Sequence, residues 1–378
     1  MNPKILVFCP YYLPHIGGLE SHADEFNKYL TLNGFEVTVF TPRFPKDSPK
    51  IEIKYGNVEI IRFPAWEIIA NYPVPCFWTK EFWVLWKNLK TKKYNWVISR
   101  TRFFLTSVMA LYFAKKNETR WLHIEHGSDF VKLNNPIKSN LGKFVDYTIG
   151  RYILKNATEV VANSKASADF CKKLYYFRDY KFIYRGVELG QIENNIEIQK
   201  RYKDKVKIIF AGRLIDGKGV RDLVEAVSKI YLGNWVLLII GDGPRKFDLE
   251  KYVNDLGLQS KIKFLGQLPR ADLMGIINIG DIVVNPSYTE GLPTSVIEAA
   301  ICGKAIIATD VGGTREIIDD GKSGILISAK DIKILKNKIE ILINNKKLRE
   351  QLGQEASKKV KNSFNWKISI KKYINILK

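Results

Sequence analysis

Two basic residues follow the first apolar run in the second half of the chain. Arg213 comes just after residues 206–211, and Lys218 stands just before the next helical segment. A guanidinium fork and an ammonium group at one strand end are suited to holding a diphosphate, and they would stabilise the negative charge of a departing phosphate. In so basic a chain, the competing interpretation is a pair of solvated charges.

Two carboxylates, Glu290 and Glu298, flank the segment 291–295. Pro293 is favoured in the first turn of a helix, so the backbone amides of this segment would form an anion site. The two carboxylates would accept hydrogen bonds from the hydroxyl groups of a sugar and a ribose. The alternative is one capping acid and one surface acid.

The first half offers a glycine pair and a histidine. Gly17 and Gly18 lie between the apolar run 5–8 and a helical segment at 19–30, where they would let the backbone approach a phosphate or a sugar. His126 follows another apolar run and could hydrogen-bond a sugar hydroxyl. A simple tight turn and a structural histidine remain the alternatives.

Twelve apolar, β-branched runs alternate with helix-period segments along the chain. They lie at 5–8, 37–40, 58–61, 96–99, 121–124 and 159–162, and again at 206–211, 235–240, 262–265, 282–285, 305–308 and 324–327. This alternation predicts largely parallel sheets with helices on both faces. The polar segment 188–205 separates the two series, so we expect two domains with a hinge there. In such sheets ligands bind outside the carboxyl ends of the strands, where all the residues above are placed.

The formal charge of +21 indicates an anionic partner, which could be a nucleotide diphosphate, an acidic phospholipid or a nucleic acid. A nucleic-acid-binding protein is therefore one alternative function. The even spread of the charge over both halves argues against it, and we expect no nucleic-acid partner.

The sequence shows no stretch near the ~18 apolar residues of a membrane span and no signal-type cleavage region. The four cysteines are far apart and lack metal-type spacing, which suits a reducing compartment. We therefore expect a cytoplasmic protein.

A basic-aromatic segment at residues 80–93 suggests contact with an anionic membrane. Phe82, Leu85, Trp86 and Leu89 would form one helical stripe with Trp83 beside it. Lysines close to this stripe suit lipid headgroups. The alternative is a helix that buries its stripe on its own sheet.

The order and spacing of these motifs resemble retaining glycosyltransferase family 4 over nearly the whole chain. In the second half the motifs are Ala211-Gly212-Arg213-Leu214, Lys218-Gly219, Gly241-Asp242-Gly243-Pro244, residues 286–293 up to Glu298, and Val311-Gly312-Gly313 with Glu316. In the first half they are Gly17-Gly18-Leu19-Glu20, His126-Gly127, Asn163-Ser164 and Gly186-Val187-Glu188. One departure is the stretch Tyr184-Arg185-Gly186-Val187-Glu188, where the family commonly has Asn-Gly-Val-Asp.

The resemblance implies an α/β GT-B fold, with two facing Rossmann-like domains, a central cleft and a C-terminal helix that crosses back. The N-terminal domain, which would bind the acceptor, would comprise residues 1–187 and 365–378. Residues 188–364 would bind the nucleotide sugar.

The resemblance also implies roles for the residues above. Arg213 and Lys218 would bind the donor diphosphate, Glu290 the transferred sugar and Glu298 the ribose, with His126 near the reacting centre. The implied donor-binding residues are Gly17, Gly18, Gly212, Gly243, Leu268, Gly291, Leu292, Pro293, Thr294 and Glu298.

The implied reaction is a retaining transfer of a hexose from a UDP- or GDP-linked donor to a glycan or a lipid-linked saccharide, in cell-envelope polysaccharide assembly. The departing diphosphate would help to deprotonate the acceptor hydroxyl. Neither a metal nor another cofactor is expected, because basic side chains and helix amides would replace the cation. A nucleotide-sugar epimerase on the same architecture is the second alternative.

Overall fold

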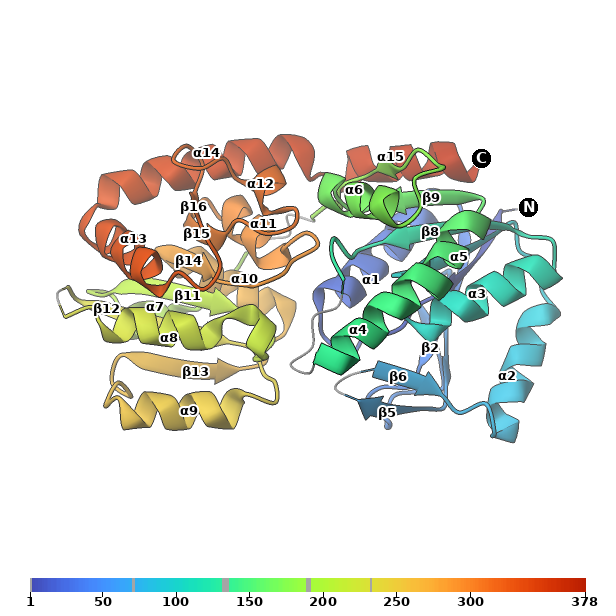
Figure 1. Ribbon diagram of the computed structural model, residues 1–378, viewed down its shortest axis with the longest axis horizontal. Helices are drawn as coiled ribbons and strands as arrows, with labels where there is room; N and C mark the ends of the chain where they lie inside the picture. Colours follow the sequence, from blue (N-terminus) through green and yellow to red (C-terminus); the bar gives the residue numbers. More distant parts are fainter. Residues whose placement is uncertain (1, 70–71, 131–135, 188–191, 232) are drawn as a thin grey trace. The chain divides into compact units, whose positions relative to one another are not determined.

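The computed structural model describes residues 2–69, 72–130, 136–187, 192–231 and 233–378, and it divides the chain into two compact units. Unit 1 comprises Met1–Gly186 and Trp366–Lys378, and unit 2 comprises Val187–Asn365. Each unit is built on a parallel sheet flanked by helices (Figure 1). Among the described helices, none is both long and apolar enough to cross a membrane.

The sheet of unit 1 has the strand order β10-β9-β8-β7-β1-β2-β4-β3. Its strands are β1 (Lys4–Phe8), β2 (Glu36–Pro42), β3 (Ile51–Lys54), β4 (Val58–Phe63), β7 (Trp96–Arg100), β8 (Arg120–Glu125), β9 (Glu159–Ala162) and β10 (Lys181–Phe182). The described pairings are parallel except that of β3 with β4. A separate antiparallel hairpin is formed by β5 (Ala65–Ile69) and β6 (Tyr72–Pro75).

Helices cover both faces of this sheet, which explains why its central strands are apolar on both sides. The helices are α1 (Gly18–Thr31), α2 (Lys80–Lys90), α3 (Leu105–Lys116), α4 (Pro136–Val145), the π-helical turn η1 (Asp146–Gly150), α5 (Arg151–Asn156) and α6 (Lys165–Leu174). One core cluster packs Leu6 and Phe8 against α2 and α3, and the other packs Ile5 and Val7 against α1.

The last helix, α15 (Trp366–Leu377), belongs to unit 1 although it follows unit 2 in the sequence. Trp366, Ile370, Tyr373 and Leu377 bury one face of it in the core beside α1. The indole Nε1 of Trp96 donates to the backbone oxygen of Leu377 at 2.8 Å. The predicted return of the chain to its first domain is confirmed.

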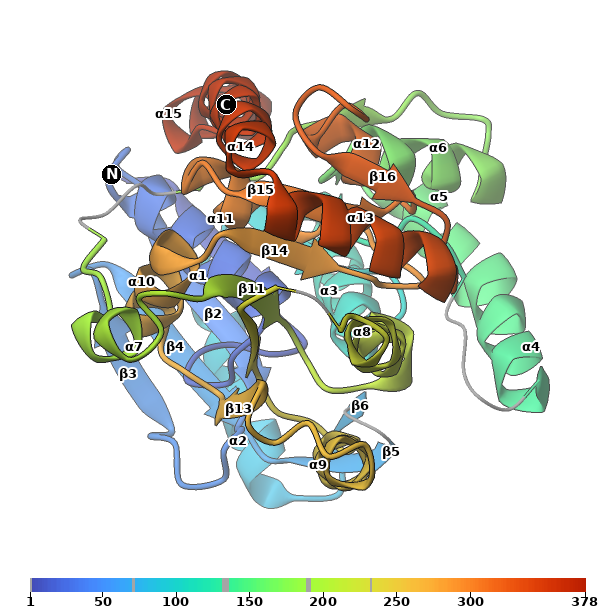
Figure 2. The same ribbon diagram turned by 90° about the vertical axis from the view of Figure 1, so that its left-hand side faces the viewer.

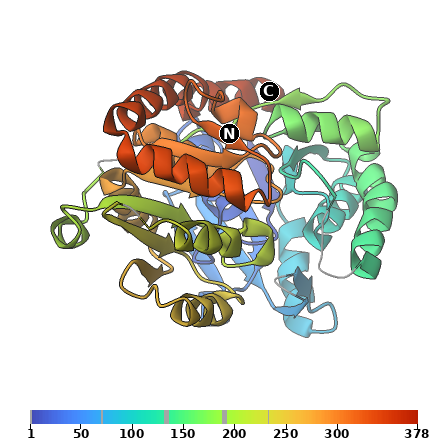
Figure 3. The ribbon, with the colours of Figure 1, turned by 60° about the vertical axis from the view of Figure 1, so that its left-hand side comes forward.

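Unit 2 holds a six-stranded parallel sheet with the order β13-β12-β11-β14-β15-β16. Its strands are β11 (Val206–Ala211), β12 (Trp235–Ile240), β13 (Ile262–Gly266), β14 (Ile282–Asn285), β15 (Ala305–Thr309) and β16 (Ile325–Ile327). Its helices are α7 (Ile196–Arg201), the 3-10 turn η2 (Asp216–Lys218), α8 (Val220–Ser228), α9 (Lys246–Asp255), α10 (Arg270–Ile279), α11 (Thr294–Ile301), α12 (Thr314–Ile317), α13 (Ile332–Asn344) and α14 (Lys346–Ser363). Helices α8 and α13 pack side by side against the sheet (Figure 2 and Figure 3).

Helix α2 corrects the membrane interpretation of residues 80–93. Phe82, Trp86 and Leu89 are buried in the core of unit 1, and Leu85 packs against it. The predicted stripe therefore packs on its own sheet. Trp83 lies outside the stripe, is 47% exposed, and its indole Nε1 donates to the backbone oxygen of Phe77 at 2.6 Å.

Candidate functional site

The strand order of unit 2 creates a topological switch point between β11 and β14. The chain proceeds from β11 to β12 and β13 on one side, and then from β14 to β15 and β16 on the other. The loops that leave the carboxyl ends of two such strands diverge, and ligands of open parallel sheets bind at this point. Lys218 follows β11, and Glu290 follows β14.

The structure brings these two predicted residues together. The ammonium Nζ of Lys218 lies 2.6 Å from Oε1 of Glu290, and both side chains are largely buried. The amide of Asn285 donates to Ser295 Oγ at 3.0 Å and lies 3.5 Å from the same Glu290 oxygen. The end of β14, its loop and the start of α11 thus hold one ion pair in place.

The backbone makes this approach possible. Gly219 has a φ of +63°, and a Cβ atom there would lie 2.1 Å from the backbone oxygen of Pro286. The backbone N–H of Tyr288 donates to the oxygen of Gly217 at 2.8 Å. A glycine at 219 is therefore needed for the loops after β11 and β14 to meet.

Arg213 lies on the same edge but outside this ion pair. Its side chain is exposed, and the described residues provide it with no ion-pair partner. Gly212 donates its N–H to Ile240 at 3.0 Å. Gly243 has a φ of +158°, and a Cβ atom there would lie 2.5 Å from the oxygen of Leu214. These glycines hold the loops after β11 and β12 together.

Glu298 lies further along the same edge, on α11, and is 5% exposed. Its Oε1 lies 3.8 Å from a guanidinium nitrogen of Arg270, the first residue of α10. The loop that precedes α11 is tied to the loop after β15, because Gly313 donates to the oxygen of Gly291 at 2.9 Å. Pro293 is the N-cap of α11, and Thr294 is its first residue, as predicted. Leu292 and Pro293 are buried, and Leu268 is half-buried in the loop before α10.

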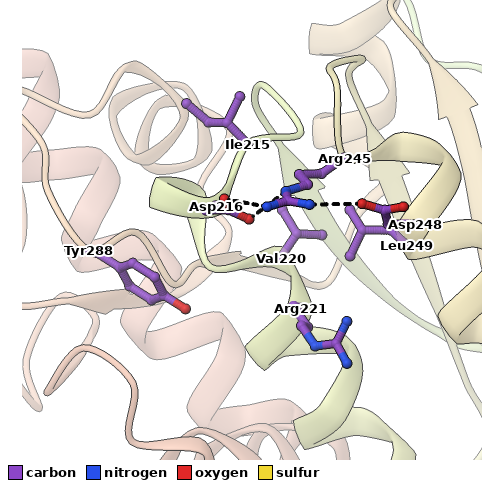
Figure 4. Close-up of a pocket in the computed structure, with 8 residues that line it drawn as sticks. All are labelled: Ile215, Asp216, Val220, Arg221, Arg245, Asp248, Leu249 and Tyr288. Carbon is purple, nitrogen blue, oxygen red and sulfur yellow. Dashed lines mark hydrogen bonds and ion pairs between the residues drawn. The ribbon is translucent and has the colours of Figure 1, made fainter. Parts of the chain in front are cut away.

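A hollow of about 220 Å³ opens next to this edge. Figure 4 shows Arg245 between Asp216 and Asp248, with hydrogen bonds of 2.8 to 2.9 Å. The phenol of Tyr288 donates to Asp222 at 2.9 Å. The residues predicted to bind the donor do not line this hollow. Its walls are formed by Ile215, Asp216, Val220, Arg221, Arg245, Asp248, Leu249 and Tyr288.

In unit 1, His126 follows β8 at the carboxyl edge of the sheet. Oε1 of the preceding Glu125 accepts hydrogen bonds from the N–H groups of His126 at 2.9 Å and Gly127 at 2.7 Å. Arg102 pairs with Glu125 at 3.1 Å and with Asp146 at 2.9 Å. All three charged side chains are buried. Burial opposes ionisation of Glu125, but Arg102 and His123 outweigh it and hold the pKa of this carboxyl well below its ordinary value. The turn that presents His126 is therefore fixed by a buried carboxylate.

The imidazole of His126 lies among cationic and neutral partners. Its ring centroid is 5.0 Å from that of His22, whose Nδ1 lies 2.7 Å from a guanidinium nitrogen of Arg100. Burial and the charge of Arg100 lower the pKa of His126 to about 3 and that of His22 well below its ordinary value. His126 is therefore a neutral imidazole at physiological pH.

Gly17 and Gly18 begin helix α1 beside a second buried network. Arg185 donates to the backbone oxygen of Gly18 at 3.2 Å and to Glu25 at 3.3 Å. The indole of Trp366 donates to the same Glu25 oxygen at 2.7 Å. Arg185 stands where the sequence departs from the family pattern, and its contacts tie α1 to the segment that precedes Gly186.

Sequence reasoning missed four of the buried charged or histidine residues around these sites, and also the half-buried Arg270. The four are His22, Arg100, Arg102 and Glu125. The run Ser99-Arg100-Thr101-Arg102 at the end of an apolar strand was a usable signal, because arginines are almost never buried unless they are paired.

Two family models cover most of the chain. Residues 16–191 match Glycosyltransferase Family 4, and residues 191–359 match Glycosyl transferases group 1. An uncharacterised glycosyltransferase of Methanocaldococcus jannaschii is 38% identical over 99% of this chain and 97% of its own length. The alpha-monoglucosyldiacylglycerol synthase of Acholeplasma laidlawii is 27% identical over 90% of this chain and 88% of its own.

Solved structures share the fold over the full length. The sucrose-phosphate synthase of Thermosynechococcus elongatus has a TM-score of 0.86 at 20% identity and covers 100% of this chain and 98% of its own. HepE of Anabaena, solved in complex with UDP-glucose, has a TM-score of 0.78 at 18% identity and covers 99% of each chain. The chain therefore belongs to the glycosyltransferases of the GT-B fold.

Proposed function

We propose that this glycosyltransferase is a retaining, metal-independent hexosyltransferase with a UDP- or GDP-linked donor. The acceptor is a glycan or a lipid-linked saccharide in cell-envelope polysaccharide assembly, and the enzyme works in the cytoplasm. The ion pair between Lys218 and Glu290 at the switch point of unit 2 carries this proposal. The UDP-glucose bound by HepE and the glycolipid named for the Acholeplasma relative support the choice of donor and acceptor.

The edge of unit 2 supplies the charges that the donor requires. The Lys218 ammonium has three N–H donors, so it can hold Glu290 and a phosphate oxygen together. Arg213 adds a bidentate fork, and the backbone amides at the start of α11 add positive potential. Glu290 accepts from hydroxyls of the transferred sugar, and Glu298 accepts from those of the ribose.

These groups favour departure of the diphosphate. The bond between the anomeric carbon and the phosphate oxygen breaks, and its electron pair stays on that oxygen. Lys218, which Glu290 holds in place before the reaction begins, and Arg213 stabilise the resulting charge. The acceptor oxygen bonds to the anomeric carbon on the same face, and its proton passes to the departing diphosphate. The anomeric configuration is thereby retained.

A donor screen tests this function together with its independence of metal. We expect acceptor-dependent release of UDP or GDP from one nucleotide sugar of a panel, at the same rate with and without EDTA. The physical reason is that Arg213, Lys218 and the α11 amides already supply the positive potential of a cation.

The anomer of the product is read by NMR in the same reactions. A product of inverted configuration would exclude retention. Activity that disappears in EDTA and returns with Mg²⁺ or Mn²⁺ would exclude the proposed leaving-group chemistry. In the described residues, no group of His, Cys, Asp and Glu side chains is arranged to hold a metal ion.

We place the membrane contact on helix α4, now that the stripe of α2 is assigned to the core. Ile137, Leu141 and Phe144 are 79%, 61% and 64% exposed and lie at helical spacing on one face, hereafter the α4 face. Helices α4 and α5 follow one another along unit 1 (Figure 1). Lys143, Arg151 and Lys155 give this part of unit 1 exposed positive charge, whereas the acidic Asp146 is buried against Arg102. An apolar face among basic residues suits an anionic bilayer.

Replacing the α4 face by serine should abolish binding to anionic vesicles. We expect the triple variant Ile137→Ser, Leu141→Ser and Phe144→Ser to stay in the supernatant when wild type sediments with anionic lipid. The apolar side chains are lost from the bilayer boundary, while the core of unit 1 keeps all its contacts. Co-sedimentation with vesicles of phosphatidylcholine and phosphatidylglycerol measures the effect.

A matched control removes comparable apolar surface elsewhere. Tyr231 and Phe247 of unit 2 are 85% and 76% exposed, and their serine variants should sediment like wild type. A second comparison replaces Trp66 and Trp78, an exposed pair on and near the β5-β6 hairpin with ring centroids 5.7 Å apart. Binding lost with this pair but kept by the α4 variant would move the contact to the aromatic pair.

A further inference from the structure

The two nitrogens of the His126 ring differ in their surroundings. Nδ1 lies 3.3 Å from the amide nitrogen Nδ2 of Asn163. Nε2 is buried and has no hydrogen-bond partner among the described residues. A buried polar atom without a partner is costly unless a ligand supplies one. The chemistry of His126 therefore depends on which nitrogen carries the proton.

A chain of hydrogen bonds at the start of α6 orients the Asn163 amide. Ser164 Oγ caps α6 by accepting from the backbone N–H of Ser167 at 3.0 Å. It donates to Ser167 Oγ at 2.9 Å, and Ser167 Oγ donates to Oδ1 of Asn163 at 3.0 Å. Both serines are fully buried, so the single proton of the Ser167 hydroxyl needs this acceptor. The carbonyl of the amide thus faces Ser167, and its NH₂ group faces His126.

This orientation determines the tautomer of His126. An amide NH₂ group can only donate, so Nδ1 of His126 must accept and carries no proton. The ring is neutral, because burial and Arg100 lower its pKa to about 3. A neutral imidazole without a proton on Nδ1 carries it on Nε2, the nitrogen that has no protein partner.

The charged and titratable groups that face the ring come from several elements. Arg100 at the end of β7 and Arg185 after β10 oppose a positive charge on the ring, whereas Glu125 of β8 favours it. His22 and His123 are the remaining titratable neighbours. Their balance keeps the ring neutral from acidic to alkaline pH.

We propose that Asn163 is a positioning residue that selects the Nε2–H tautomer of His126. His126 then acts as a neutral hydrogen-bond donor to an oxygen of the sugar substrate and not as a general base. A base would need its free lone pair on Nε2, the nitrogen without a protein partner, but here the lone pair is on Nδ1 and accepts from Asn163. This inference rests on the proposed function for the role of His126 in the reaction, but the tautomer itself does not.

The tautomer can be measured directly in the wild-type protein. The chain has four histidines, so ¹⁵N-histidine labelling gives a simple spectrum in which a His126→Gln variant assigns the His126 signals. We expect a protonated Nε2 and an unprotonated Nδ1 between pH 5 and pH 8. A protonated Nδ1 in wild type would overturn the proposal, whether or not the enzyme transfers sugar.

The Asn163→Asp variant should reverse the tautomer. A carboxylate accepts from Nδ1–H, so Nε2 loses its proton and the pKa of His126 rises. We expect kcat to fall by at least ~10-fold with a smaller change in KM, and the pH profile to gain an inflection from His126. In the His126→Gln background the same change should cost less than ~2-fold, since Asn163 acts through the ring.

Two controls keep this test decisive. Asn88 lies exposed on α2, and Asn88→Asp makes the same charge change without effect on kcat. Asn163→Ala removes the hydrogen bond to Nδ1 without adding charge, so the His126 ring of this variant should show both tautomers. This variant provides the test if Asn163→Asp folds poorly. Equal losses for Asn163→Asp in the wild-type and His126→Gln backgrounds would mean that Asn163 serves only the fold, and they would overturn the proposal.

Discussion

Glu290→Ala and Lys218→Ala will each reduce sugar transfer by at least ~10²-fold while the fold stays intact. This is the size expected when one fixed contact to the transition state is lost. The Lys218→Ala variant is expected to have a lower kcat, because the charge of Lys218 acts when the diphosphate departs. Steady-state kinetics on the purified variants gives the effect, and thermal unfolding confirms that the structure is retained.

An ion pair of the same kind on the surface provides the control. Glu225 of α8 and Lys229, the C-cap of this helix, pair at 2.9 Å and are more exposed than Lys218 and Glu290. Lys229→Ala and Glu225→Ala should leave transfer within ~2-fold of wild type, since exposed pairs contribute little. If Lys218→Ala or Glu290→Ala turns over like wild type with unchanged melting, that residue does not belong to the site.

Replacement of Arg102 by leucine will destabilise unit 1 by about 3–5 kcal/mol, the usual cost of breaking a buried ion pair. Glu125 and Asp146 would remain as buried carboxylates without a counter-charge, and the guanidinium would be lost from the face of Phe170, 4.5 Å from the ring centroid. Urea unfolding measures the change. Because the two units can unfold separately, it is followed through the tryptophans of unit 1, and Trp235 of unit 2 is replaced by phenylalanine in both proteins.

Arg245 of unit 2 is the matched control for Arg102, and its unfolding is followed through Trp235, which is kept for this comparison, as the difference from the same protein with Trp235→Phe. It also bridges two carboxylates, Asp216 and Asp248, with similar distances, but its side chain is 45% exposed. Arg245→Leu should cost far less than Arg102→Leu, because ion pairs between exposed side chains contribute little. Similar losses for Arg102→Leu and Arg245→Leu would show that burial does not govern the strength of the Arg102 network.

The fold could be predicted from the sequence wherever strands are buried on both sides. The twelve apolar runs correspond to strands of the two main sheets, because parallel strands covered by helices must be apolar throughout. The exceptions are short or half-exposed. β3 alternates exposed and half-buried residues, and β10 has only two residues, so neither leaves a continuous apolar run. Helix α2 shows a second limit of prediction from sequence. Its apolar stripe was compatible with burial in the protein core and with contact to a membrane, and only the packing in the structure distinguishes these two possibilities.

The candidate site was predictable as a set of strand ends but not as contacts. Lys218 and Glu290 are separated by 72 residues, and their meeting depends on the order of β11 and β14 in the sheet. That order is a property of the topology, which local patterns do not encode. The buried networks of Arg102 and Arg100 were missed because charged residues are usually solvated, and only the structure shows which of them are paired in a core.

The central claim is that a nucleotide-sugar donor binds at the carboxyl edge of unit 2. Amide hydrogen exchange in the presence of a nucleoside diphosphate tests this claim most directly. Amide exchange is followed by mass spectrometry in the presence of UDP and, separately, of GDP. We predict that one of them protects peptides covering residues 211–219 and 286–298, and that Lys218→Ala weakens this protection. Protection of other segments alone, or no protection by either nucleotide at saturating concentration, would contradict the account.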